Sequence, residues 1–176
     1  MLSLKKKEVF LLNKNLKLDN LLNDIATGWT KSYYEGITKT STDINGNKFA
    51  PLKESTVFMK KLKGYGSPKK PLLAEGKMRN TYVKTKATKS KQFAVISINN
   101  RDRKIASKVH NEGNKPYSIK PKRKSHLSFP TKDGWVRTKE VQHTGQKKRE
   151  WYGIGKVQLK LASKIAKKHI QKALLK

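Results

Sequence analysis

The stretch from Lys156 to Leu174 constrains the fold most, because it is apolar around much of a helix. At 100° per residue one broad arc is formed by Leu159, Leu161, Ala162, Ile165, Ala166, His169, Ile170, Ala173 and Leu174. An arc this wide predicts a helix that is buried on more than one side. The remaining ridge carries Lys160, Lys164, Lys167, Lys168 and Lys172. That ridge is either a solvated face or a surface that docks on an acidic partner or DNA.

A second apolar stripe predicts a helix from Leu16 to Glu35. Its members recur every three or four residues: Leu18, Leu22, Ile25, Trp29 and Tyr33. Asp19 lies near the positive N-terminal end of this helix, where a negative charge is favourable. Because the helix needs this face for its core, we interpret the two aromatic residues as core packing and not as a stacking platform for bases.

The middle of the chain predicts strands and a third helix. Residues 82–87 and 93–98 alternate with period two and are expected to form an antiparallel hairpin. After a turn at Asn99-Asn100, residues 103–112 predict a short helix that ends at Gly113. Earlier, Asn45-Gly46 predicts a tight turn, and Ser55 is a candidate N-cap for a short helix over residues 56–62.

Residues 114–148 predict an inserted basic β-arm. Two short β-like runs flank Asp133-Gly134, a favoured hairpin turn. A cluster of basic residues precedes them, and residues 142–149 are expected to be mobile. At the other end of the sequence, the apolar run in residues 1–15 predicts an N-terminal arm or edge strand.

Together these patterns predict an α+β fold in one domain over residues 1–176. A small antiparallel sheet of hairpins would be packed by the long N-terminal helix and the C-terminal helix. Only 35% of the residues are hydrophobic, so the core should be thin. No apolar run approaches the roughly 20 residues that span a bilayer, and we expect a soluble protein without membrane contact.

The chain is very basic, with 42 Lys and Arg against 12 Asp and Glu, a formal charge of +30. Such a surface attracts polyanions, acidic proteins or simply water. Only six of the basic residues are Arg, the residue that reads bases and phosphates bidentately. Specific base readout is therefore disfavoured, while non-specific contact with DNA and docking on acidic neighbours both stay open.

The sequence offers little for catalysis. It has no Cys, and its four His residues, at positions 110, 126, 143 and 169, are too scattered for a metal-binding signature. Its sparse carboxylates do not predict a metal-dependent nuclease, and its glycine–lysine loop at 62–70 lacks phosphate-loop spacing. We therefore expect no enzyme, no metal and no cofactor.

Four motifs in a fixed order carry a family resemblance. They are DINGNKFAPLKEST (43–56), PLLAEGKMRN (71–80), IASKVHNEG (105–113) and REWYGIG (149–155). This set resembles the virion-morphogenesis or tail-completion (neck) proteins of tailed phages, including Mu-like phages. The resemblance covers residues 16–113 and 149–174, and it departs from the family pattern at Ala50, at Glu75 and in the long excursion 114–148.

The resemblance implies a structural virion protein and no catalysis. Such proteins complete the tail or the head–tail junction as ring subunits, for example in a hexamer. Their partners would be further copies, tail terminator or tail-tube proteins, head–tail connector proteins and, non-specifically, genomic DNA. Their location would be the virion neck or tail, and the host cytoplasm during assembly. The rival hypothesis is a basic protein that binds nucleic acids non-specifically.

We expect two groups of contact residues from these arguments. Candidate subunit or partner contacts are Phe49, Pro51, Leu52, Gly76, Arg79, His110, Gly113, Trp151 and Tyr152. Candidate contacts to DNA or an acidic partner are Lys120, Lys122, Arg123, Lys124, Lys160, Lys164, Lys167 and Lys168.

Overall fold

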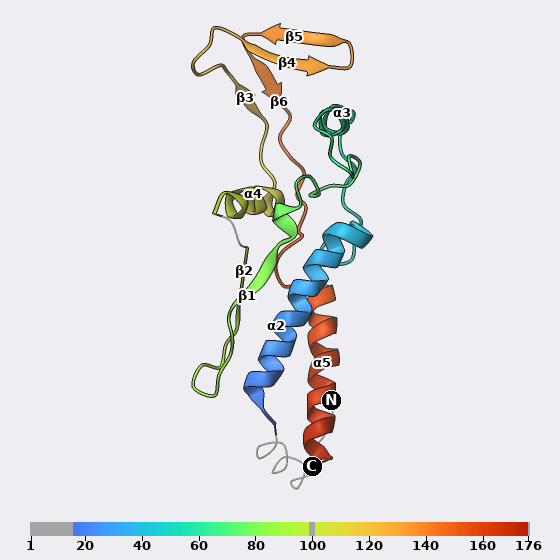
Figure 1. Cartoon of the computed structure of the whole chain (residues 1–176), viewed down its shortest axis with the longest axis vertical. Coiled ribbons are helices and arrows are strands. Elements are labelled where there is room, and N and C mark those ends of the chain that lie inside the picture. The colour runs from blue at the N-terminus through green and yellow to red at the C-terminus, as the bar shows by residue number, and fades with distance from the viewer. Residues whose placement is uncertain (1–15, 99–100, 176) are drawn as a thin grey trace.

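Two long helices lie side by side at one end of the molecule (Figure 1). They are α2 (Leu18–Glu35) and α5 (Lys156–Leu174) in a computed structural model that describes residues 16–98 and 101–175. The two helices pack against each other. The expected arm at 1–15 and the expected turn at Asn99-Asn100 lie outside the described residues.

Gly28 explains how closely α2 and α5 approach. A Cβ atom added there would meet the Ile165 Cδ1 atom at 3.0 Å and the Leu161 Cδ2 atom at 3.3 Å. Further along, His169 Nε2 contacts Asp24 Oδ2 at 2.8 Å. The outer part of the apolar arc faces solvent, since Leu159 is 58% exposed. The prediction of burial on more than one side is therefore wrong at this position, because α2 covers one side of α5.

The helical path of α2 extends beyond the predicted end. A wider π-helical turn, η1 (Gly36–Thr40), follows α2 directly, where the sequence predicts loss of helix at residue 36. Ser41 ends it in the left-handed region with φ of 52°. This extra turn carries Ile37 into the core, where it is fully buried.

A short helix and a hairpin follow. Helix α3 (Glu54–Leu62) begins before the predicted N-cap Ser55; the capping position is the extended Lys53, and no side chain caps it. After the 3-10 turn η2 (Lys77–Arg79), strands β1 (Thr81–Thr85) and β2 (Val95–Ile98) pair antiparallel, which confirms the hairpin with shorter strands. Helix α4 (Arg101–Glu112) starts two residues before the predicted one.

Residues 114–148 contain four short strands at the end of the molecule opposite the C-terminus (Figure 1). β4 (Leu127–Thr131) and β5 (Gly134–Thr138) form the hairpin predicted at Asp133-Gly134. β3 (Tyr117–Ile119) pairs with β6 (Val141–His143), and Asn114 bridges to Gln146. Backbone hydrogen bonds therefore engage the segment 142–149 at β6, at Gln146 and at Arg149, and its mobility stays a prediction.

The fold is α+β, as predicted, although the strands in the described ranges form three separate two-stranded ladders and not one sheet. The main core lies where α2, η1, β2 and α4 meet the segment before α5. Its buried members are Tyr33, Ile37, Ile44, Phe49, Met78, Ile98 and Trp151. No helix in the described ranges combines the length and the apolar character that a membrane crossing requires.

Candidate functional site

The four sequence motifs meet in this core. Phe49 comes from the first motif, Met78 from the second and Trp151 from the fourth, and Ala106 of the third packs against them. Phe49 and Trp151, the outermost of these residues, are about a hundred positions apart in the sequence. We call this meeting point, with the segments that bond to it, the motif hub.

The turn of the first motif forms hydrogen bonds to the N-terminus of α5. Asp43 Oδ1 accepts the N–H groups of Asn45 and Asn47, each at 2.8 Å, and so fixes the turn. The Ile44 carbonyl then accepts the Val157 N–H at 3.0 Å, and Asn45 Oδ1 accepts the Lys156 N–H at 3.2 Å. Because the first N–H groups of a helix have no partner within it, this turn caps α5 from a distant part of the chain.

Asn111 joins the third motif to the fourth. Its Oδ1 atom accepts the N–H groups of Trp151 at 3.1 Å and Tyr152 at 3.3 Å, and its Nδ2 group donates to the Tyr152 carbonyl. One half-buried amide side chain thus satisfies three backbone groups. Sequence analysis missed Asn111, because its partners lie far along the chain and follow no periodic pattern.

Two tyrosine side chains pack against each other in the hub. Tyr33 and Tyr152 have ring centroids 5.0 Å apart. The Tyr33 hydroxyl donates to the Gly153 carbonyl at 2.7 Å, and the Tyr152 hydroxyl donates to the Ile96 carbonyl at 2.8 Å. Burial, with a smaller contribution from Tyr152, raises the pKa of Tyr33 to about 12. Both hydroxyls therefore act as neutral hydrogen-bond donors that tie α2, β2 and the last motif together.

His110 sits at the junction between α4 and the β-arm segment. Its Nδ1 atom contacts Gln146 Nε2, and its carbonyl accepts the Arg149 N–H at 2.7 Å. Burial, and secondarily the Arg149 cation, lower the pKa of His110 to about 4. The imidazole is therefore neutral near pH 7. Gly113 adopts φ of +74°, and a Cβ atom there would come within 2.8 Å of the Gln146 carbonyl oxygen, so a larger residue does not fit.

Two lysines hold the glycine–lysine loop in place, Lys60 from α3 and Lys70 from the loop itself. Lys60 is buried, and its amine donates to the carbonyls of Ser67 at 3.1 Å and Lys70 at 2.7 Å. Lys70 in turn donates to the Thr38 carbonyl at 2.7 Å. Burial lowers the pKa of Lys60. These amines hold the loop to η1 and α3.

A cavity of about 190 Å³ lies beside the hub. The Trp151 Nε1 and Gln158 Oε1 atoms, which line it, are buried and have no hydrogen-bond partner in the described part of the chain. Its two carboxylates are engaged elsewhere, because Glu35 pairs with Lys39 at 3.0 Å and Asp43 fixes its own turn. The cavity thus offers polar groups but no free acid–base pair.

The predicted contact residues divide by exposure. Phe49, Gly76 and Trp151 are buried in this chain's own structure, and Trp151 is only 2% exposed. Leu52, Arg79, His110, Gly113 and Tyr152 are half-buried, and Pro51 is exposed. The Arg79 guanidinium lies 5.5 Å from the ring centroid of the exposed Tyr34. Pro51, and Arg79 beside the exposed Tyr34, are therefore accessible candidates for contact with another protein.

The predicted basic contacts form two groups that the fold does not bring together. Lys120, Lys122, Arg123 and Lys124 are exposed between β3 and β4, while Lys160, Lys164, Lys167 and Lys168 are exposed along α5. Figure 1 places these elements at opposite ends of the molecule. A single small anion cannot bridge them, whereas a long polyanion or separate partners can.

Over residues 16–98 and 101–175, no three His, Asp or Glu side chains gather into a metal-binding group. No family model, curated protein or solved structure matches the chain. The chemistry of the site must therefore be inferred from its own residues.

Proposed function

We propose that this chain is a structural subunit of a tailed-phage virion, at the neck or the head-proximal end of the tail. Copies of it would form a ring, such as a hexamer, that completes the tail or joins it to the head. One observation carries the proposal: the four motifs that resemble tail-completion proteins meet in one hub. The hub residues cap a helix, bond to backbone groups of distant segments and pack the core, which are structural roles. The proposal includes no catalysis and no cofactor.

The exposed surface beside the hub supports a ring. A closed ring repeats one heterologous contact, so each subunit needs two different accessible faces. Arg79, beside the exposed Tyr34, is accessible to a neighbouring copy, while Pro51 and Leu52 are accessible to a different partner. Each copy carries +30, so a ring also requires acidic neighbours or DNA nearby. Tail terminator, tail-tube and connector proteins are the proposed protein neighbours, in the virion and in the host cytoplasm during assembly.

The test is an Arg79→Ala variant in a phage or prophage whose own copy of the gene has been deleted. A half-buried cation over an aromatic ring contributes only about 0.5–2 kcal/mol, so the variant should fold. Heads and tails should then accumulate unjoined in electron micrographs. The exposed Lys89→Ala variant is the control, with normal particles expected. Normal particles from Arg79→Ala would show that Arg79 is not part of the interface. A wild-type protein that never sediments as a ring would overturn the proposal.

One observation favours non-specific nucleic-acid binding as a second candidate. Trp135 on β5 is 75% exposed, and Arg137 lies two residues on, on the same face of the strand. A two-stranded ribbon fits the major groove of duplex DNA. If this candidate holds, the monomer binds duplex DNA tightly at physiological salt, affinity falls steeply with log salt, and Trp135→Ser weakens binding. Ring formation without such binding favours the neck subunit.

A further inference from the structure

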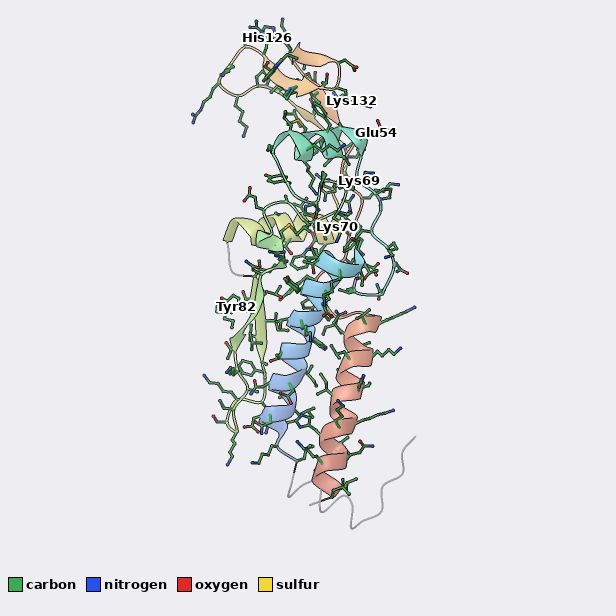
Figure 2. All side chains as sticks on the ribbon, turned by 45° about the vertical axis from the view of Figure 1, so that its right-hand side comes forward. Glu54, Lys69, Lys70, Tyr82, His126 and Lys132 are labelled. Carbon is green, nitrogen blue, oxygen red and sulfur yellow. The ribbon has the colours of Figure 1, made fainter. Side chains whose placement is uncertain are left out.

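A groove of about 420 Å³ lies between α3 and the turn that joins β4 to β5. Pro51, Leu52, Val57 and Phe58 form its apolar wall. Figure 2 shows Glu54 and Lys132 close together at this place, with Lys69 on the loop below. The groove joins a residue pair of the first motif to the β-arm segment, and no residue of it serves the hub core described above.

Two contacts hold the two walls of the groove together. Lys132 Nζ pairs with Glu54 Oε2 at 2.7 Å, and Lys53 Nζ contacts Thr144 Oγ1. Both contacts are exposed, so they are weak individually. The groove is therefore formed by two elements that are distant in sequence and joined by weak surface contacts.

The rim of the groove is basic. Lys61 and Lys69 are exposed, and neither forms an ion pair within the described ranges, whereas Glu54 is already paired with Lys132. Two uncompensated positive charges thus flank an apolar wall. A ligand that fits must place apolar groups in the groove and negative charges at the rim.

The chain itself does not supply such a ligand. Its closest two acidic residues in sequence, Asp19 and Asp24, both belong to helix α2. A second copy would also bring another +30 to the rim. Nucleic acid fits poorly as well, because the wall is mainly aliphatic and offers one aromatic ring, whereas single strands bind by stacking on aromatic side chains.

We propose that this groove docks a short acidic segment of another protein that carries a large apolar side chain. Such a segment would place a Leu or Phe side chain against Leu52, Val57 and Phe58, and its carboxylates against Lys61 and Lys69. The inference deepens the proposed function by naming the chemistry of a neighbouring virion protein, and it rests on that function only for where the neighbour is found.

The test is fluorescence anisotropy of the full chain with three labelled peptides. Glu-Asp-Leu-Phe-Glu-Asp should bind, whereas Glu-Asp-Ser-Ser-Glu-Asp and Lys-Lys-Leu-Phe-Lys-Lys should bind far more weakly. The double variant Lys61→Glu with Lys69→Glu should lose about tenfold in affinity, as charge reversal at an interface predicts. Leu52→Ser should weaken the binding of Glu-Asp-Leu-Phe-Glu-Asp and leave the weak binding of Glu-Asp-Ser-Ser-Glu-Asp unchanged. Circular dichroism on each variant verifies the fold.

The matched control is Lys164→Glu with Lys168→Glu on α5, which changes the net charge equally at exposed lysines away from the groove. It should keep at least most of the affinity. If both double variants lose the same affinity, or if the two acidic peptides bind equally well, the proposed docking in the groove is wrong and general charge attraction explains the binding. If dodecanoate binds and depends on Lys61 and Lys69 while no peptide binds, the proposed peptide docking is wrong and the groove takes a lipid-like ligand. Sedimentation of the same proteins without peptide tests ring formation separately, so either idea can fail alone.

Discussion

The motif hub and the β-arm segment are stabilised in different ways. In the hub, buried or half-buried side chains satisfy backbone groups of distant segments, as Asn111 does for Trp151 and Tyr152. In segment 114–148, strands pair with each other, and most side chains of β5 stay exposed. Burial of apolar area contributes far more free energy than exposed ion pairs do. The hub therefore determines the stability of the fold, and the arm segment is left to present charge and aromatic surface.

The largest expected effect is that of Trp151→Ala in the hub. Removing a fully buried Trp should lower the free energy of unfolding by about 3–5 kcal/mol, because transfer and cavity terms add. Urea unfolding followed by circular dichroism measures it. Trp135→Ala on the arm is the matched control and should change stability by less than about 0.5 kcal/mol. Comparable losses from the two Trp variants would contradict the contrast between hub and arm.

Asn111→Ala should have the second largest effect. It removes an acceptor of the Tyr152 N–H and the donor to the Tyr152 carbonyl, while the Trp151 N–H keeps its bond to the Arg149 carbonyl, and an unsatisfied group of this kind costs about 1–3 kcal/mol. Asn111→Asp should fall between wild type and Asn111→Ala, because it keeps the acceptor and loses the donor. Gln142→Ala, at an exposed position on β6, serves as the control in the same urea experiment. An Asn111→Ala variant as stable as Gln142→Ala would show that the hub does not depend on this amide.

The pH dependence of His110 provides a third test. Its pKa is about 4 in the folded protein and about 6.5 when unfolded, so the unfolded chain binds the proton more readily. Its contribution to stability is therefore complete above pH 6.5 and is lost as pH falls toward 4. The thermal midpoint should drop across this window, and the drop should be smaller in His110→Gln. An identical pH profile in that variant would contradict the burial of this imidazole.

The smallest effect is expected at the Lys132–Glu54 contact between the arm segment and α3. Hydrogen bonding and attraction to Lys132 lower the pKa of Glu54, but both side chains are exposed. A double-mutant cycle with Glu54→Gln and Lys132→Gln should give a coupling close to the measurement error, and salt should reduce it further. A strong coupling that resists salt would mean that the arm segment is fixed to the body as firmly as the hub is.

Local sequence patterns predicted the elements but not their partners. The stripe from Leu18 to Tyr33 and the Asp133-Gly134 turn predicted α2 and the β4–β5 hairpin, because periodicity and turn chemistry act within a few residues. The same patterns placed the N-cap of α3 at Ser55, because serine is a favoured capping residue, whereas the N-cap position is the extended Lys53. They also missed η1, because a π-helical turn follows no 3.6-residue period.

The sequence by itself determined the α+β composition, the two long helices and the strongly basic surface. Only the tertiary structure decided that Ile44 and Asn45 cap α5, that Asn111 clamps the last motif, and that Leu52 shares a groove with Lys132. The physical reason is that apolar periodicity records which face of one element avoids water. A hydrogen bond or groove between segments a hundred residues apart depends on how those faces meet, and it leaves no periodic trace in either segment.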